Sequence, residues 1–354
     1  MEQLIQAANA VSTTSDVAST TSAVSEAVNT ASTSGDASPL LVAGGVVVGV
    51  AVVGTGVGAA VLYFKTIPRP KGVDPQLLAQ FADPEKMAGY HAKMEANATW
   101  LDQQQPQDLF VTSSDGLRLH AYYLPAAVPS GKVAIIHHGF MGQARESGAH
   151  AKFFHNQGYE VLLLDLRAHG QSEGKYVGFG ILDRYDTLAW VQEARKRFGQ
   201  DAKIVLHGTS MGAATTLMSL GLPEVQEQVS AAIADCPFTS PAAIFSHVIR
   251  TNFHIPITAP IIKLNGLITK AVAGYSFEDY STLEALKDNK VPVLFVHGKA
   301  DTFIPLEMSD QNFEACSAKK ERLLVDGAGH GSSIFEDTAL YEDSEKKFLE
   351  ELGI

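Results

Sequence analysis

The sequence has little cysteine, no block of basic residues and no spacing typical of a metal-binding motif. It contains two cysteines, Cys236 and Cys316, so it is not a disulfide-stabilised scaffold. Lys and Arg total 27 against 39 Asp and Glu, and this acidic balance argues against a nucleic-acid-binding protein. Neither H-E-x-x-H nor C-x-x-C occurs, so local spacing implies no metal and no cofactor. The hydrophobic content of 45% excludes a wholly disordered chain.

Charge is also absent from a long segment near the N-terminus. Residues 37–64 carry no charged side chain, and most of them are Val, Ala, Gly and Leu. Because a helix needs about 20 apolar residues to cross a bilayer, residues 39–64 are predicted to form a transmembrane helix. A signal peptide would begin with basic residues, whereas the preceding segment is acidic. That segment, residues 1–38, contains 22 Ser, Thr and Ala residues and is predicted to be a disordered tail.

The distribution of basic residues predicts how this helix is oriented. No basic residue precedes the span, and three follow it closely: Lys65, Arg69 and Lys71. The positive-inside rule therefore predicts a single-pass protein of the cell membrane, with everything after Lys65 in the cytoplasm. Two distant thiols agree with a reducing compartment. Two glycine pairs have the spacing of close helix packing and are compatible with a weak homodimer: Gly45 with Gly49, and Gly54 with Gly58.

Beyond the span, a linker and N-terminal helix over 65–104 lead to a change of pattern. Short apolar runs alternate with helical patterns over 105–354, which predicts an α/β fold with a mostly parallel central sheet and helices on both faces. The predicted strands are a hairpin over 109–124, then 133–137, 161–165, 204–207, 231–235, 291–297 and 322–325. The interval 237–290 is too long for an ordinary connection and is predicted to form a small helical lid.

The candidate nucleophile follows the strand at 204–207. In an open α/β sheet, ligands bind beyond the carboxyl ends of the strands, so the residues after each strand form the candidate site. Here the sequence is Gly208-Thr209-Ser210-Met211-Gly212, followed by a helical pattern. G-x-S-x-G between a strand and a helix is typical of a sharp turn that exposes a serine at a helix N-terminus. We therefore expect Ser210 to be the nucleophile.

A serine nucleophile needs a base, and the base needs an orienting carboxylate. His330 lies in a glycine-rich loop after the last predicted strand and is the candidate base. Asp301 follows the strand at 291–297 and is the candidate acid, although a helix-capping or turn role is also open to it. Asp235, at the end of the preceding strand, is the alternative acid.

The loop after the strand at 133–137 is the candidate oxyanion hole. It reads His138-Gly139-Phe140-Met141-Gly142, and the backbone N–H of Phe140 can point toward the acyl site together with that of Met211. We expect His138 to shape this loop rather than transfer protons. The segment 165–172 is interpreted as a structural turn network.

Taken together, these motifs resemble the serine α/β-hydrolase superfamily over about residues 105–352. The chain order Ser210, Asp301, His330 is that of the superfamily. Residues 173–180 and 234–238 resemble a bacterial branch described as YqkD-like or prolyl-oligopeptidase-like. The motifs that carry the resemblance are His138-Gly139-Phe140, Asp165-x-Arg167-x-His169-Gly170-x-Ser172, Gly208-x-Ser210-Met211-Gly212, His297-Gly298-x-x-Asp301 and Gly329-His330.

The expected activity is that of a serine hydrolase of the carboxylesterase or lipase type, which cleaves carboxylic esters or related acyl compounds through an acyl-enzyme. An apolar lid near a membrane favours a small-molecule or lipid-like acyl substrate. An acyltransferase, a thioesterase or a peptidase would use the same serine turn with a different pocket. A non-catalytic, membrane-tethered binding protein is a further alternative.

Overall fold

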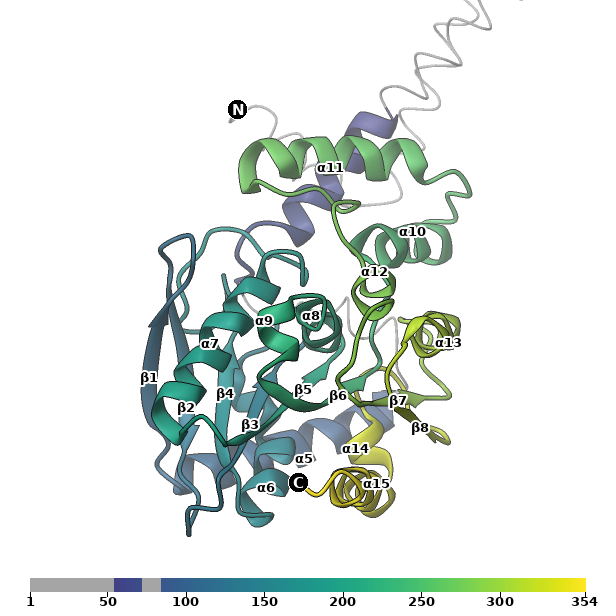
Figure 1. Ribbon diagram of the computed structural model, residues 1–354. Coiled ribbons are helices and arrows are strands. Elements are labelled where there is room, and N and C mark those ends of the chain that lie inside the picture. The colour runs from purple at the N-terminus through teal and green to yellow at the C-terminus, as the bar shows by residue number, and fades with distance from the viewer. Residues whose placement is uncertain (1–53, 72–83) are drawn as a thin grey trace, which may run out of the picture. The chain divides into compact units, whose positions relative to one another are not determined.

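The alternation of short apolar segments and helices builds an eight-stranded sheet in a computed structural model that describes residues 54–71 and 84–354 (Figure 1). The predicted tail, most of the predicted span, and Gly45 and Gly49 lie outside the described residues. The described residues divide into two units. Unit 1 comprises 54–67 and 255–276, and unit 2 comprises 68–71, 84–254 and 277–354.

The sheet lies in unit 2 and has the order β1-β2-β4-β3-β5-β6-β7-β8. β1 pairs with β2 and β2 with β4 in antiparallel register, and all other neighbours are parallel, so the predicted hairpin and mostly parallel sheet are confirmed. Every residue of β4 and β7 is buried, which explains the apolar runs 161–164 and 293–296 within them. The strands are β1 (Gln107–Thr112), β2 (Arg118–Leu124), β3 (Lys132–His137), β4 (Glu160–Asp165), β5 (Lys203–Thr209), β6 (Val229–Asp235), β7 (Val293–Gly298) and β8 (Lys320–Val325).

Helices cover both faces of this sheet. One layer consists of α5 (Pro84–Gln103), the 3-10 turn η1 (Ala144–Ser147), α6 (Gly148–Asn156), α14 (Ser333–Glu336) and α15 (Thr338–Glu351). The other contains α7 (Asp183–Phe198), α8 (Met211–Ser219), α9 (Pro223–Gln226), α12 (Thr282–Leu286) and α13 (Leu306–Ala315); α7 packs on α8, and α12 lies between α8 and α13. The N-terminal helix predicted within 65–104 corresponds to α5.

The main apolar core lies between the sheet and the layer that contains α5, α6 and α15. Leu101, Phe154, Tyr341 and Phe348 reach it from these helices, and each is 0% exposed. Burying one such side chain contributes about 1.5–3 kcal/mol. This packing holds the sheet rigid beneath the carboxyl ends of its parallel strands, where the candidate site lies.

Unit 1 pairs a short N-terminal helix with a helix from the predicted lid. Residues 54–66 are helical, and α11 (Ala259–Ala273) packs on them. The side-chain amide of Asn265 donates to the carbonyl oxygen of Ala59 at 2.8 Å. A Cβ on Gly58 would lie 3.1 Å from Cδ1 of Ile261, so this glycine allows the two helices to approach closely. Gly58, named above for a helix dimer, thus has a neighbour within its own chain.

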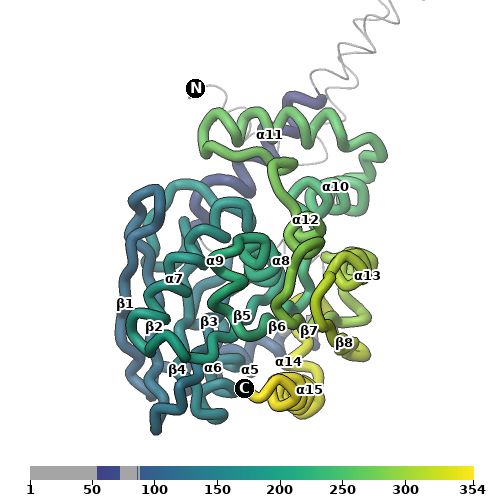
Figure 2. The backbone as a smooth tube through the Cα atoms, in the orientation of Figure 1, coloured from purple at the N-terminus to yellow at the C-terminus, as the bar shows by residue number. Residues whose placement is uncertain are grey.

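None of the helices within 54–71 and 84–354 is both long and apolar enough to cross a membrane. Of the predicted span, only residues 54–64 belong to the described chain. The predicted lid interval contains three helices: α10 (Pro241–Asn252), α11 and α12. Figure 2 traces the chain from β6 through these helices to β7. The structure assigns residues 255–276 of this interval to unit 1 and its two flanks to unit 2, a division that the sequence pattern did not predict.

Candidate active site

Ser210 occupies a tight turn between β5 and α8. Its backbone has φ 58° and ψ −118°, a conformation that non-glycine residues adopt at a cost of about 1–3 kcal/mol. The Ser210 amide donates to the carbonyl oxygen of Asp235 at 2.8 Å, which ties the turn to the end of β6. A Cβ on Gly208 would lie 2.3 Å from the carbonyl oxygen of Gly212, so only glycine fits there. The turn therefore presents the Ser210 hydroxyl at the carboxyl edge of the sheet.

Ser210, His330 and Asp301 form a continuous hydrogen-bonded relay. The Ser210 hydroxyl donates to His330 Nε2 at 2.9 Å, and His330 Nδ1–H donates to Asp301 Oδ2 at 2.8 Å. One neutral tautomer of His330, protonated at Nδ1, satisfies both contacts. The three residues come from the turns after β5, β7 and β8. The fold thus brings together the three residues that the sequence predicted.

Both carboxylate oxygens of Asp301 are engaged. Oδ1 accepts the backbone N–H groups of Phe303 and Ile304, each at 2.9 Å, while Oδ2 faces His330. Burial favours the neutral acid, but the charge and hydrogen bond of His330 outweigh it and hold the pKa of Asp301 below its ordinary value. Asp301 thus orders its own turn, the alternative role considered above, and also orients the imidazole.

The charge state of His330 follows from the same pair. Burial disfavours the imidazolium, but the Asp301 carboxylate stabilises it more strongly, so the pKa of His330 is raised above its ordinary value. The side chain is 21% exposed and lies edge-on to the ring of Phe303, with ring centroids 4.8 Å apart. A histidine that gains basicity in this way is suited to take a proton from Ser210.

Asp235, the alternative acid, is placed differently. Its Oδ1 accepts the Ser333 hydroxyl at 3.2 Å, and burial raises the pKa of Asp235 to about 7. His330 Nδ1 is already bonded to Asp301. The geometry therefore assigns the orienting contact to Asp301.

The loop after β3 reaches the serine as the sequence predicts. A Cβ on Gly139 would lie 3.5 Å from Cβ of Ser210, so Phe140, the next residue, follows at the edge of the site. Met211 is the first residue of α8, and its N–H is among those that a helix leaves without an intrahelical acceptor. His138 donates from Nδ1 to the Gly139 carbonyl at 2.7 Å and accepts at Nε2 from the Leu166 N–H at 3.1 Å. These two bonds hold the loop in place, in agreement with the structural role expected for His138.

The segment after β4 forms a polar network, as interpreted from its sequence. Asp165 accepts the backbone N–H groups of Ala144 and Gln171, each at 2.9 Å. The guanidinium of Arg167 binds both carboxylate oxygens of Asp186, at 2.6 and 2.7 Å. These contacts fasten the segment to η1 and α7 and so stabilise the loops around the site.

Cys236 lies beside the relay without joining it. Its thiol, Asp301 and His330 place their ligating atoms within 4.8 Å of one another, a group that has metal-binding residue types. Asp301 and His330, however, are bonded to each other, and burial raises the pKa of the Cys236 thiol well above its ordinary value. A protonated thiol is a poor ligand and a poor nucleophile, so the chemistry of this group belongs to the relay.

Comparison with known proteins identifies the family. Residues 128–273 match the model of the family described as serine aminopeptidase, S33. The chain belongs to the serine α/β-hydrolase superfamily. It is 26% identical over 253 residues to YqkD of Bacillus subtilis, which covers 71% of this chain and 82% of YqkD. It is 25% identical over 274 residues to the bifunctional esterase/perhydrolase DCH of Acinetobacter calcoaceticus, covering 66% of this chain and 97% of that protein.

A solved structure shows the same fold. The Pyrococcus furiosus esterase Pf2001 superposes with a TM-score of 0.56 at 21% identity, covering 71% of this chain and 94% of that one. The predicted α/β-hydrolase fold is therefore confirmed.

An aromatic cluster that the sequence did not predict surrounds Phe140 of this hydrolase. The Phe140 ring packs on Phe179 with centroids 5.2 Å apart, and Phe179 in turn packs on Phe245 of α10 at 5.1 Å. Phe277 extends the cluster at 4.9 Å from Phe245. Of these residues, Phe179 is the one that the sequence could have marked, because it lies between Gly178 and Gly180. In the structure its backbone adopts φ 49°. The cluster gives the candidate oxyanion loop apolar neighbours on one side, while the His169 ring also packs against Phe140.

Proposed function

We propose that this hydrolase is a serine esterase that cleaves carboxylic esters through an acyl-enzyme. The observation that carries the proposal is the relay from Ser210 through His330 to Asp301, with contacts of 2.9 and 2.8 Å. The esterase names of DCH and Pf2001 agree with it. The proposal gives each member of the relay a role in one reaction.

In the first half-reaction, the Ser210 oxygen attacks the acyl carbon and its proton passes to His330 Nε2. The N–H groups of Phe140 and Met211 hold the negatively charged oxygen of the tetrahedral intermediate. The bond to the alcohol oxygen then breaks, and His330 returns the proton to the departing alcohol. Asp301 stabilises the imidazolium while it exists.

Water completes the cycle in the second half-reaction. His330 takes a proton from the water as its oxygen attacks the acyl-enzyme, and the Ser210–acyl bond breaks. The acid product leaves, and the proton returns to the Ser210 oxygen. No other group is consumed, so the net reaction is ester plus water to acid plus alcohol.

The Phe140 ring, which is partly exposed while its three aromatic neighbours are buried, favours an apolar acyl group. A substrate with a longer acyl chain gains apolar contact area, at about 25 cal/mol per Å² buried. Activity on p-nitrophenyl esters should therefore hold or rise from acetate to medium-length chains. A sharp loss of activity on esters with acyl chains longer than acetate would contradict the proposal of a lipid-like substrate.

Peptide cleavage is the second candidate, because the matching family is described as serine aminopeptidases. The same relay would attack an amide in place of an ester. Assays with aminoacyl p-nitroanilides beside p-nitrophenyl esters distinguish the two: a higher kcat/KM on the anilides would replace the esterase assignment with a peptidase one. An acyltransferase would form a new ester when an alcohol is added to the p-nitrophenyl ester assay. A thioesterase would cleave a thioester used in place of the p-nitrophenyl ester.

Membrane anchoring is part of the proposal. The uncharged segment 37–64 supports it, as do the apolar residues that unit 1 exposes. Ile257 is 71% exposed and Leu267 of α11 is 67% exposed, and α11 also carries Lys263 and Lys270. A helix with apolar and basic residues is typical of a membrane interface. We propose a single span with the hydrolase unit in the cytoplasm.

Two measurements test the anchor and its orientation. Alkaline extraction of membranes should leave the chain in the pellet, and release into the supernatant would contradict the anchor. Protease treatment of intact bacterial cells should spare a C-terminal epitope. Its loss would place the hydrolase unit on the outer side.

Labelling by a fluorophosphonate probe tests the chemistry directly. The wild-type chain should be labelled, and labelling should disappear in Ser210→Ala. Ser219→Ala is a matched control, because Ser219 is a buried serine at the other end of α8 and should not affect labelling. An unlabelled, folded wild-type chain would support a non-catalytic binding protein instead.

A further inference from the structure

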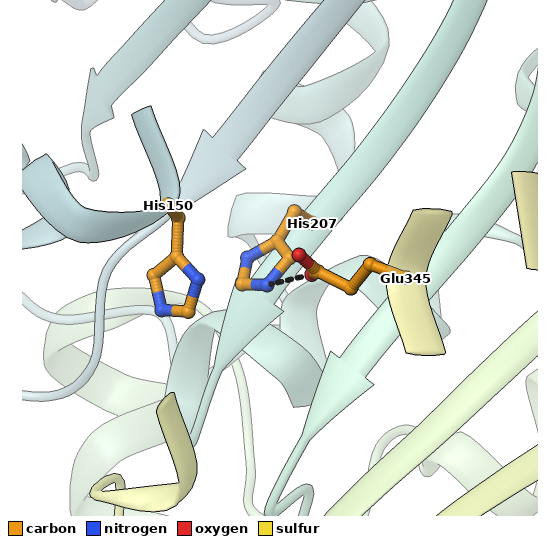
Figure 3. Close-up of side chains that lie close together, drawn as sticks. All are labelled: His150, His207 and Glu345. Carbon is orange, nitrogen blue, oxygen red and sulfur yellow. Dashed lines mark ion pairs between the residues drawn. The ribbon is translucent and has the colours of Figure 1, made fainter. Parts of the chain in front are cut away.

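A second group of ionisable side chains lies in the core, away from the relay. His150 of α6, His207 of β5 and Glu345 of α15 converge from three elements, and Figure 3 shows the two imidazoles and the carboxylate side by side. His207 and Glu345 are 0% exposed and His150 is 6% exposed. These three residues, the His150 cluster, have no part in the proposed reaction.

The polar atoms of the His150 cluster are poorly satisfied. Among the described residues, His150 Nδ1, His207 Nδ1 and both carboxylate oxygens of Glu345 are buried and make no hydrogen bond. The one contact of the carboxylate inside the cluster is the ion pair of Oε1 with His207 Nε2, drawn as a dashed line in Figure 3. Each such buried polar group costs about 1–3 kcal/mol, and more for a charged one. Burying these atoms together in an apolar core is therefore strongly unfavourable unless a ligand joins them.

The ligand atoms are close enough for small side-chain shifts to bring them onto one ion. One ligand atom from each residue lies within 4.8 Å of the others. His207 Nε2 lies 3.2 Å from Glu345 Oε1. A tetrahedral Zn²⁺ with bonds of about 2.0–2.1 Å separates its ligand atoms by about 3.3 Å. The hydroxyl group of Tyr341 lies beside the cluster and makes a hydrogen bond of 3.2 Å with His207 Nε2.

We propose that His150, His207 and Glu345 bind a structural Zn²⁺ ion, with Tyr341 beside it. Two imidazole nitrogens and a carboxylate favour zinc over Ca²⁺ or Mg²⁺, which prefer oxygen ligands only. Iron sites of the same composition keep open positions for substrates, whereas this cluster is closed by the core.

The ion would join parts of the chain that are far apart in sequence. α6 and α15 pack on the sheet from the same side, and β5 carries His207 three residues before Ser210. A bond from each element to one ion fixes both helices against the strand that leads to the serine turn. Removing the ion should therefore lower thermal stability first, and activity only through the position of that strand.

Metal analysis of the purified full-length chain tests the site. After growth with added zinc and dialysis against buffer, we expect about one zinc ion per chain by mass spectrometry. Replacement by Co²⁺ should give the visible d–d bands of a tetrahedral site. Removal of the metal with a strong chelator should lower the Tm of the wild type by about 10 °C, and zinc should restore it. This test needs no substitution and is independent of the esterase assignment.

Variants of the proposed ligands, compared with control variants on the same helices, test where the zinc binds. His150→Gln and Glu345→Gln should each lose the zinc, whereas His155→Gln on α6 and Glu342→Gln on α15 should keep it. Cys236→Ala should also keep it, which separates this cluster from the thiol beside the relay. Zinc that is absent from the wild type, that persists in His150→Gln and Glu345→Gln, or that depends on Cys236 would overturn the proposal.

Discussion

Gly212 packs directly against the end of β3: a Cβ on this residue would lie 2.2 Å from the carbonyl oxygen of His137. Helix α8 therefore begins in contact with the strand that carries the candidate oxyanion loop. The contact sets the distance between the Met211 and Phe140 amides, which come from these two elements. A change in this distance should lower the rate of ester cleavage while the contacts among Ser210, His330 and Asp301 stay as they are.

Gly212→Ala should force α8 away from β3 and lower kcat/KM at least about 100-fold, because a displacement of 1 Å is enough for such a loss. Gly89→Ala is the control. No atom lies within 4 Å of the added Cβ of this residue of α5, so activity should be unchanged and the free energy of unfolding should rise by about 1 kcal/mol. Ester hydrolysis and urea unfolding measure the two effects. Full activity in Gly212→Ala would contradict the argument.

Asp301→Asn and Asp235→Asn distinguish the two candidate acids. An amide at 301 cannot stabilise the imidazolium or hold the right tautomer, so kcat should fall by about 10⁴-fold. Asp235 is bonded to Ser333, and its substitution should change kcat by less than about tenfold. The reverse ranking in steady-state kinetics would move the acid to Asp235.

The pH dependence of kcat/KM should follow His330. The base must be neutral to accept the Ser210 proton, so activity should rise as the pH increases through the pKa of His330. Because Asp301 raises that pKa, the midpoint should lie above the ordinary histidine value of about 6.5. In Asp301→Asn the main cause of the raised pKa is removed and only the weaker effect of Asp235 remains, so the midpoint of the residual activity should move to lower pH. An unchanged midpoint would show that another group controls the profile.

Arg167→Ala should destabilise the fold strongly. It leaves the Asp186 carboxylate, 4% exposed, without its guanidinium partner, and the loss of one partner of a buried ion pair costs about 3–5 kcal/mol. Arg197→Ala removes an exposed pair with Glu193 on α7 and should cost less than about 0.5 kcal/mol. Urea denaturation compares the two, and equal losses would contradict the importance assigned to the buried pair.

The sequence alone was sufficient to predict that Ser210, Asp301 and His330 lie together, because each of them follows a strand of the parallel sheet. Parallel strands end at the same edge of a sheet, so Ser210, Asp301 and His330 meet there whatever the details of the helices. The choice between Asp301 and Asp235 depended on which carboxylate lies opposite Nδ1 of His330. That is a matter of side-chain direction in three dimensions, which strand ends alone do not determine.

Two other features had no local signal. The antiparallel pairing of β2 with β4 joins the predicted hairpin to the sheet, but no sequence pattern specified this partner. The His150 cluster combines residues from α6, β5 and α15, whose separations resemble no metal-binding motif. Tertiary packing, rather than propensity or spacing, creates both features.

The relay spans 120 residues between Ser210 and His330, and this length sets the time at which the site is completed. A ribosome that adds 5–20 residues per second needs about 10 s to travel from the serine codon to the histidine codon. Throughout this interval the growing chain carries the proposed nucleophile without the proposed base. On the proposed mechanism, each new molecule is therefore unreactive toward esters until β8 has joined the sheet.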